Sequence, residues 1–283
     1  MVSLAALSVG FFEVWFYLAF ALAKQLFGFG CPLNLRLGFL LIVTLGLGMR
    51  TLAWNCRGAS RALTVRALKA LIREKSPDVG FEAESKSKSH RIERIHSSIG
   101  FVDKFCVEPV GKSGGLAIFW KAGMDLEIVY SDKNVIASLV YSDPPSSPWL
   151  FLLIYGPPHV NGRERFWKCL EELVSAFAGP WLVIRDFNCV DSNLDKRGGR
   201  YLGEALTRSF SNFVHAIGAI GLGFIGSRFT WSNKCEGLAN IKERLDKAVC
   251  NQEWQCLFPK AGVKHLVAPA SDHAPIILDT HMD

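Results

Sequence analysis

The sequence lacks the tracts of proline, serine or glutamine that keep a chain disordered, and its charged content of 20% is ordinary for a folded protein. No stretch has the composition of a linker, and no segment repeats at a fixed period, which excludes a solenoid. A chain of 283 residues can bury a sizeable core. We therefore expect a globular protein whose main body is one domain.

The eight cysteines include no C-x-x-C pair and have no histidines at zinc-ligand spacing. Several lie inside apolar runs, where a thiol behaves as a small hydrophobe. We expect free thiols rather than a disulfide framework. The net charge of +6 suits a polyanionic partner such as nucleic acid without specifying one.

Residues 1–48 form an apolar N-terminal extension unlike the rest of the chain. Residues 2–23 are a candidate membrane anchor, because about 20 helical residues span a bilayer. The triplet Ala21-Leu22-Ala23 resembles a signal-peptidase site, but no lysine or arginine precedes it to form a positive n-region. Met49 is a natural start for the domain, and we favour a non-native extension. The protein would then be intracellular (nuclear or cytoplasmic), and membrane-associated if the extension is present.

The apolar runs of residues 49–283 predict an α/β domain. Strands are expected at residues 51–55, 78–83, 99–107, 115–120, 126–130, 135–141, 149–155, 181–184, 229–232 and 274–278. Helices are expected at residues 64–75, 163–177, 205–217 and 241–249, and a polar loop at 84–90. Because helices are interspersed among more numerous strands, the pattern indicates a two-sheet sandwich with outer helices.

Polar residues follow several of the expected strands, where strand ends can converge on one edge of a sheet. They are Asn55, Glu84, Tyr155, Asp186, Asn188, Asp246, Asp272 and His273. Carboxylates, amides and a histidine together suit a hard cation and phosphodiester hydrolysis. A single aspartate after a strand is more often a turn former or helix cap, so the ordered set carries the argument. Asp186 and Asn188 would share one face if their segment is extended.

The order Asn, Glu, Tyr, Asp-x-Asn, Asp, Ser-Asp-His over residues 50–281 resembles the endonuclease/exonuclease/phosphatase superfamily. Its flanking segments resemble the endonuclease domain of plant LINE-type (non-LTR) retrotransposons. These segments are Trp54-Asn55-Cys56-Arg57-Gly58, Gly114-Gly115-Leu116-Ala117, Phe229-Thr230-Trp231-Ser232-Asn233 and Glu243-Arg244-Leu245-Asp246. The resemblance implies a DNase I-like fold, a four-layer two-sheet β-sandwich flanked by helices. It also implies a DNA-nicking enzyme that uses Mg²⁺, with Mn²⁺ as the alternative ion.

The resemblance assigns a metal site. Glu84 would be the principal Mg²⁺ ligand, with Asn55 close by and Asp272 beside the metal. Asp186 would align or deprotonate the attacking water. The metal would act as a Lewis acid on the phosphate.

The resemblance also assigns groups to the phosphate. Asn188 and Tyr155 would hold phosphate oxygens. His273 would contact the scissile phosphate and stabilise the developing charge, with Asp246 orienting its ring.

Three features depart from the family pattern. Arg185 stands where glycine usually precedes Asp-x-Asn, so it either crowds the site or adds a phosphate contact. Glu82 replaces an apolar residue and by strand alternation would share a face with Glu84, as an alternate ligand or a surface group. The sequence ends shortly after Ser-Asp-His without a reverse transcriptase, which favours a truncated remnant or a derived host gene. An inactive relic and a phosphatase or phospholipase of the same superfamily are the alternatives to a nuclease.

Other residues are candidates for binding the substrate. Lys196, Arg197 and Arg200 form a basic cluster that could grip a DNA backbone or belong to a solvated loop. Trp231 could stack on a displaced base or belong to the core. His96 has no evident partner in the sequence and receives no role.

Overall fold

The computed structural model describes residues 48–282 apart from 112–113, 146 and 269, with the backbone alone for residues 204–207. The candidate membrane anchor at residues 2–23 and the triplet at 21–23 lie outside this range. Within the described range, no helix has both the length and the apolar character needed to cross a bilayer. The seven cysteines in this range are free thiols, as expected.

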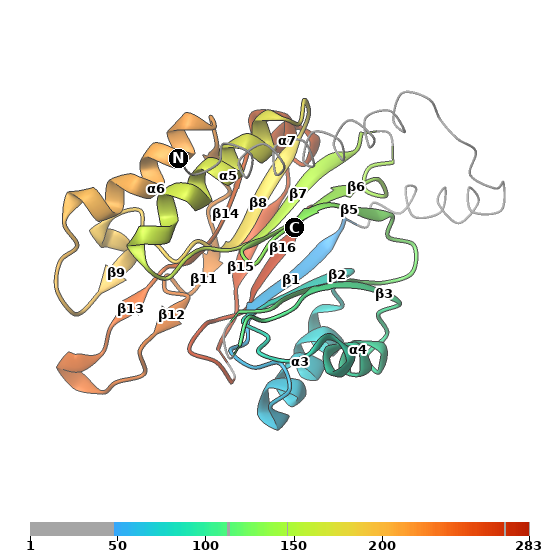
Figure 1. The fold of residues 1–283 in the computed structure, drawn as a ribbon, viewed down its shortest axis with the longest axis horizontal. Helices are drawn as coiled ribbons and strands as arrows, with labels where there is room; N and C mark the ends of the chain where they lie inside the picture. The colour runs from blue at the N-terminus through green and yellow to red at the C-terminus, as the bar shows by residue number, and fades with distance from the viewer. Residues whose placement is uncertain (1–47, 112–113, 146, 269, 283) are drawn as a thin grey trace, which may run out of the picture.

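Two mixed β-sheets face each other in the centre of the molecule (Figure 1). The seven-stranded sheet contains, in spatial order, β11 (Ile225–Gly226), β15 (Gly262–His265), β16 (Ile276–Asp279), β1 (Arg50–Asn55), β2 (Val79–Ala83), β4 (Leu116–Trp120) and β3 (Asp103–Val107). The six-stranded sheet contains β10 (Ile220–Gly221), β14 (Asp246–Cys250), β8 (Trp181–Asp186), β7 (Trp149–Tyr155), β6 (Val135–Val140) and β5 (Leu126–Ser131). A small third sheet contains β12 (Trp231–Ser232), β13 (Lys242–Glu243) and β9 (Lys196–Arg197).

Helices cover the outer faces of the two large sheets (Figure 1). The five α-helices of the described chain are α3 (Ala62–Lys75), α4 (Ser89–Ser97), α5 (Arg163–Ser175), α6 (Glu204–Ala216) and α7 (Gln252–Leu257). Three short 3₁₀ turns are η1 (Val160–Gly162), η2 (Asn193–Asp195) and η3 (Gly237–Ala239). Helices α3 and α4 lie against the seven-stranded sheet, and α5 and α6 lie against the six-stranded sheet. The domain is therefore a four-layer α/β sandwich.

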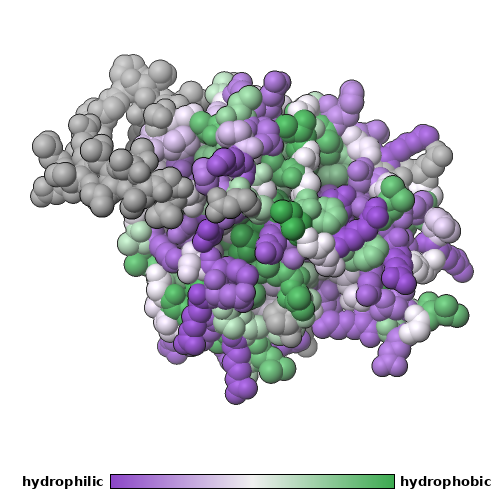
Figure 2. Space-filling view, turned by 180° about the vertical axis from the view of Figure 1, so that it is seen from behind, coloured by the Kyte–Doolittle hydropathy of each residue, from purple (hydrophilic) through white to green (hydrophobic). Residues whose placement is uncertain are grey.

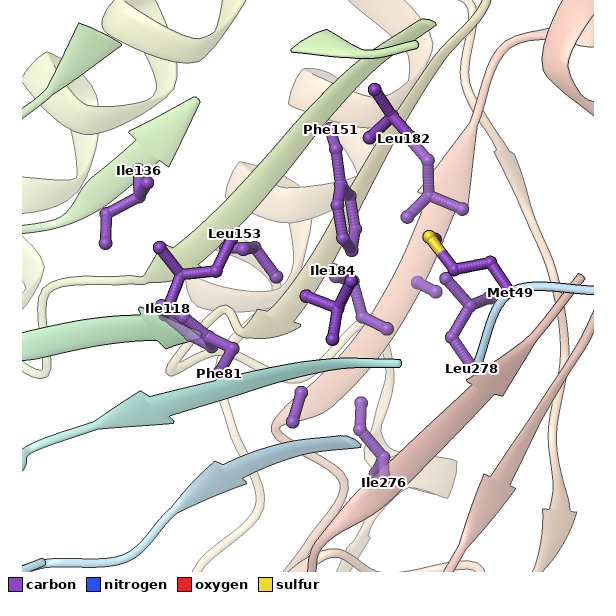
Figure 3. Close-up of a cluster of buried hydrophobic side chains, with 14 of the residues drawn as sticks. Met49, Phe81, Ile118, Ile136, Phe151, Leu153, Leu182, Ile184, Ile276 and Leu278 are labelled. Carbon is purple, nitrogen blue, oxygen red and sulfur yellow. The ribbon is translucent and has the colours of Figure 1, made fainter. Parts of the chain in front are cut away.

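Three apolar clusters fill the spaces between these layers. The central cluster lies between the two sheets, where Phe81 and Ile118 face Leu153 and Ile184 (Figure 3). The other two join each sheet to its helices, for example Leu68 of α3 with Phe119 of β4, and Leu170 of α5 with the six-stranded sheet. Because each large sheet is covered on both faces, its central strands read as continuous apolar runs.

The molecular surface is polar over most of the face seen in Figure 2, with smaller apolar areas between the hydrophilic side chains. Large apolar residues that are exposed, such as Leu63, Val110 and Leu238, are far apart in the sequence. Single exposed apolar residues of this kind need no special explanation.

The helix expected at residues 241–249 is wrong, because this segment forms β13 and most of β14. In β14, Ala248 and Cys250 face the central cluster while Val249 faces the outer one. A strand buried on both faces has no polar alternation, and the spacing of Leu245 and Val249 then imitates a helical stripe. Pairing with β8 and β10 decides the outcome.

The sequence also failed to predict α4, which begins within the expected polar loop at residues 84–90. Only Ile92 and His96 of this helix are buried, so its apolar face is too narrow to be recognised from the pattern. The other expected helices are confirmed, with boundaries shifted by a few residues at most. Pro77 follows the end of α3, where Ser76 has a left-handed conformation with φ of 47° and donates its N–H to Ile72.

Candidate active site

The directions of the strands bring most of the sequence-predicted polar residues to one edge of the sandwich. Asn55 ends β1 and Glu84 follows β2, and these two strands are parallel. Tyr155 and Asp186 are paired at the ends of the parallel strands β7 and β8. Asp246 begins β14, which runs antiparallel to β8, and lies opposite Asp186. Within each sheet, parallel strands share one edge with the start of an antiparallel neighbour. Hydrogen bonds from Asn55 to Asp186 and from Tyr155 to Glu84 join the two edges.

Asp272 and His273 reach the same edge because they precede β16, which is antiparallel to β1. Ser271 fixes this segment by donating its hydroxyl to the Asn55 carbonyl at 2.8 Å and accepting the His273 N–H at 3.2 Å. The Trp54 indole donates to the His273 carbonyl at 3.1 Å. The Ser-Asp-His segment is therefore held to the end of β1.

A buried group of Asp186, Asp246 and His273 forms the centre of the site, with potential ligand atoms within 4.8 Å of one another. His273 Nδ1 lies 3.4 Å from Asp246 Oδ2 and 3.6 Å from Asp186 Oδ2. Asn55 Nδ2 donates to Asp186 Oδ2 at 2.9 Å and lies 3.5 Å from His273 Nε2. We call Asp186, Asp246 and His273 the buried trio.

Burial and neighbouring charges shift the pKa values of the trio in opposite directions. Burial disfavours the imidazolium of His273, but the charges of Asp186 and Asp246 outweigh burial and raise the pKa of His273. Burial raises the pKa of Asp186. For Asp246, burial is offset by the guanidinium of Arg185 and by His273, so its pKa is lowered. The environment thus separates the pKa values of two neighbouring carboxyl groups.

A second pair of carboxylates, Glu84 and Asp272, is joined by Arg57. Arg57 Nε donates to Glu84 Oε2 at 2.8 Å, and its Nη1 bonds Asp272 Oδ2. The Tyr155 hydroxyl donates to Glu84 Oε1 at 2.6 Å, and the Trp231 indole donates to Asp272 Oδ2 at 3.0 Å. We call Glu84 and Asp272 the bridged pair.

Both acids of the bridged pair are held in the ionised form. Burial would raise the pKa of Glu84, but hydrogen bonds from Tyr155 and Arg57 lower it. Burial likewise opposes ionisation of Asp272, and the charges of His273 and Arg57 lower its pKa. The pKa of Tyr155 is raised by burial and by Glu84, so its hydroxyl remains a donor.

Two groups of residues at this edge could hold a metal ion. In the buried trio the His273 imidazole already lies against both carboxylates, and the Arg185 guanidinium is 3.1 Å from Asp246 Oδ1. The bridged pair offers two ionised oxygen ligands, and the buried Asn55 Oδ1 accepts no hydrogen bond within the described chain. Hard cations prefer oxygen ligands of this kind. Glu84, Asp272 and Asn55 fit a divalent cation better than the trio does.

Asn188 does not share an extended segment with Asp186, contrary to the expectation. Strand β8 ends at Asp186, and Asn188 is left-handed with φ of 48°. Its N–H donates to Asp186 Oδ1 at 3.0 Å, and its side-chain amide donates to the Gly156 carbonyl at 2.7 Å. A Cβ at Gly156 would lie 2.5 Å from the Phe187 carbonyl, so this approach requires glycine.

Arg185 neither crowds the surface of the site nor is available to a phosphate, because its side chain is 0% exposed. It lies between the two sheets, where Nη1 faces Asp246 and donates to the carbonyls of Ala53 and Ala274 at 3.2 and 3.4 Å. Its φ of 115° belongs to the region that favours glycine. Nε and Nη2 find no acceptor among the described residues. Arg185 therefore contacts the site through Asp246, from the buried space between the two sheets.

The side chain of Glu82 is buried, and it does not share a face with the side chain of Glu84. Its carboxylate lies 3.2 Å from Nε2 of His96 in α4, and both side chains are buried. Glu84 follows the strand with φ of 50° and turns toward Tyr155. Strand alternation does not extend to Glu84, because the strand ends at Ala83. His96, for which we expected no partner, is the partner of Glu82.

The basic cluster lies at the small third sheet, which adjoins the site through the bridge between Trp231 and His273. Lys196 is paired with Glu243, its Nζ 2.5 Å from Oε1, whereas Arg197 and Arg200 are exposed. Asp195 accepts two hydrogen bonds of 2.8 Å from Arg244 and anchors the loop. Only Arg197 and Arg200 of the predicted cluster are therefore open to a ligand.

Arg57 and Thr230 are site residues that the sequence did not reveal. Thr230 Oγ1 accepts the N–H groups of Leu245 and Asp246, each at 3.1 Å, and so fixes the start of β14. Arg57 lies in the Trp-Asn-Cys-Arg-Gly segment, which was the only available signal. Its role depends on two acids that are distant in sequence.

No protein-family model matches the sequence, and no curated protein matches it. Solved structures do match, and they show that the described chain has the endonuclease/exonuclease/phosphatase (DNase I-like) fold. The endonuclease domain of TRAS1, a telomere-specific non-LTR retrotransposon, is 14% identical with a TM-score of 0.61, covering 82% of this chain and 97% of that one. The AP endonuclease LMAP from Leishmania major is 17% identical with a TM-score of 0.63, covering 84% and 89%. The 3′ phosphatase NExo from Neisseria, bound to a product DNA hairpin, is 17% identical with a TM-score of 0.63, covering 83% and 99%.

Proposed function

We propose that residues 49–283 form a Mg²⁺-dependent phosphodiester hydrolase that nicks DNA and is derived from a LINE-type retrotransposon. The observation that carries this proposal is the position of Asn55, whose amide contacts Asp186 and His273 at the edge that also holds the bridged pair. A cation site and a proton-transfer group thus lie side by side, as hydrolysis of a phosphodiester requires.

In this proposal Glu84, Asp272 and Asn55 hold the cation, which when bound supplies Lewis-acid chemistry at a phosphate oxygen. Asp186 accepts a proton from the attacking water, and its raised pKa suits a base better than that of an ordinary aspartate. Asp246 remains ionised and orients His273.

His273 in its imidazolium form donates to the phosphate and stabilises developing negative charge. The Asn188 amide gives one N–H to Gly156 and has a second N–H for a phosphate oxygen. Tyr155 has a single proton, which it gives to Glu84, so we assign it to orienting this ligand.

DNA is the proposed substrate because exposed cations and an aromatic group flank the site. Arg197 and Arg200 are exposed beside the third sheet, and the half-buried Trp231 borders the bridged pair. Cations at a site rim bind the phosphate backbone, and aromatic rings stack on bases. Three of the similar structures are named as a retrotransposon endonuclease, an AP endonuclease and a phosphatase bound to DNA.

Plasmid nicking by the full-length protein tests the proposal. We expect nicking with Mg²⁺ and none with EDTA. Glu84→Gln should slow it by about 10²-fold or more, the scale on which losing one preorganised electrostatic group slows a reaction. The control Glu172→Gln, on the exposed side of α5, should nick at the normal rate.

Two results would overturn the proposal. Hydrolysis of phosphoinositides or sphingomyelin without nicking would replace DNA by a lipid phosphodiester or phosphomonoester. A folded protein that binds Mg²⁺ and hydrolyses neither substrate would be a non-catalytic relic.

A further inference from the structure

Arg57 occupies the oxygens that a bound cation would need. Glu84 Oε1 already accepts the Tyr155 hydroxyl, and Asp272 Oδ1 lies 3.2 Å from Ser271 Oγ, whose proton goes to the Asn55 carbonyl. Arg57 bonds the other two oxygens, Glu84 Oε2 and Asp272 Oδ2. Lys86 Nζ also lies 3.5 Å from Glu84 Oε2, and the Trp231 indole also donates to Asp272 Oδ2. A cation on the bridged pair must therefore compete with this guanidinium.

Arg57 can leave the bridged pair because its side chain is 45% exposed. It lies two residues beyond β1 in a backbone held by hydrogen bonds from Cys56 to Ala83 and from Ala59 to Ser85. The guanidinium can therefore turn away from the acids while its Cα remains at the edge of the site. Arg185, the arginine paired with Asp246 of the buried trio, is fully buried and has no such freedom.

We propose that Arg57 is an exchangeable counter-ion of the metal site, an inference that rests on the proposed function. Without metal, Arg57 neutralises Glu84 and Asp272 and holds them together. A divalent cation displaces it, and the released guanidinium binds a phosphate of the DNA backbone. The planar fork of an arginine, which here spans two carboxylates, matches a phosphate equally well.

The exchange makes cation binding and DNA binding interdependent. Metal binding must break two ion pairs, which lowers the affinity for metal in the absence of DNA. A phosphate that accepts the released guanidinium compensates for that loss. The protein would therefore bind the cation more tightly when DNA is present, and by reciprocity bind DNA more tightly when the cation is present.

Mn²⁺ binding to the full-length protein, measured by electron paramagnetic resonance of the free ion, tests the first half of the exchange. Arg57→Gln removes the competing charge, so its Mn²⁺ affinity should rise by about five- to tenfold, the effect of one partly exposed charge a few ångströms away. Arg66→Gln makes the same chemical change on the exposed face of α3 and should leave the affinity unchanged. Arg57→Lys keeps the charge but cannot span both acids, so its affinity should rise less than that of Arg57→Gln.

The salt dependence of DNA binding tests the second half, with a phosphorothioate-linked duplex that limits cleavage. In Mn²⁺, the slope of log affinity against log salt should be smaller by about 1 in Arg57→Gln than in the wild type, because one phosphate contact is lost. In EDTA the two slopes should agree, since Arg57 is then bound to its acids. An arginine with only a structural role would not produce a difference that depends on metal.

Equal Mn²⁺ affinities for the wild type, Arg57→Gln and Arg57→Lys would overturn the inference. A slope difference that is the same in Mn²⁺ and EDTA would also overturn it, because Arg57 would then contact phosphate without exchange. Glu84→Gln separates these results from failure of the proposed function. If that variant binds Mn²⁺ as the wild type does, the metal is not on the bridged pair, and both the proposed site and the exchange fall.

Discussion

Replacing Arg185 by methionine should lower the free energy of unfolding by about 3 kcal/mol, because it leaves the Asp246 carboxylate buried without its guanidinium partner. Both side chains of this ion pair are 0% exposed, and Nη1 lies 3.1 Å from Oδ1. Methionine fills much of the space of an arginine and adds no charge, so the change tests the charge more than the packing.

The size of this loss in the free energy of unfolding depends on the groups that remain around Asp246 after Arg185 is replaced. Breaking a buried ion pair by removing one partner costs about 3–5 kcal/mol. The lower end applies because Asp246 Oδ2 still faces His273 Nδ1 at 3.4 Å. The Arg185 atoms Nε and Nη2 also lack acceptors in the described chain, so losing the guanidinium relieves part of its own burial cost.

Urea denaturation followed by circular dichroism, with EDTA present, measures this loss as a shift of the midpoint. Arg66→Met on the exposed face of α3 is the matched control and should change the midpoint little. The variant Arg185→Met/Asp246→Leu removes both charges, and it should be more stable than Arg185→Met alone. Replacing both members of a buried pair by apolar residues is commonly neutral or stabilising.

An Arg185→Met protein as stable as the wild type would show that Arg185 does not offset the buried charge of Asp246. A double variant that is less stable than Arg185→Met would also contradict this prediction, since the unpaired carboxylate would then not be the source of the loss. A change in the urea slope would mean that the unfolded or folded state had changed in compactness, and midpoints would no longer compare the same transition.

Two further predictions concern the backbone at Arg185 and the buried His265. Arg185→Gly should be more stable than Arg185→Ala by about 1–3 kcal/mol in urea, because φ of 115° is strained for any residue with a Cβ; equal midpoints would mean that this backbone relaxes. Burial lowers the pKa of His265, so the folded state holds it neutral while the unfolded chain binds a proton below its ordinary pKa of about 6.5. Stability from this residue is present above that value and is lost as the pH falls toward the lowered folded pKa. His265→Asn, whose amide can still donate to the Ser227 carbonyl, should therefore lose less stability than the wild type between pH 7.5 and pH 5; an equal loss would show that His265 is not the group responsible.

Local sequence patterns predicted most strands of the two sheets and three of the five helices of the described chain. They failed at residues 241–249, where a strand buried on both faces has the spacing of a helix. They also failed at α4, because only Ile92 and His96 of that helix are buried. In each case the pattern of burial depends on neighbouring elements that the local sequence does not contain.

The sequence predicted which residues lie at the candidate site better than it predicted the contacts between them. Strand ends marked by Asn55, Glu84, Asp186 and His273 converge because their strands run in compatible directions. The proposed division into a buried trio and a bridged pair follows from side-chain contacts, and no spacing in the sequence indicates it.

By itself, the sequence determined the apolar runs that become buried strands and the polar residues at their ends. Both are local properties, because the spacing of apolar residues and the polar residues at the end of a strand depend only on adjacent positions in the chain. Only the tertiary structure decided that Arg57 bonds Glu84 and Asp272, that Arg185 lies under Asp246, and that Glu82 pairs with His96. These pairs join separate elements, and the charge, exposure and pKa of each member depend on a partner that only folding brings within reach.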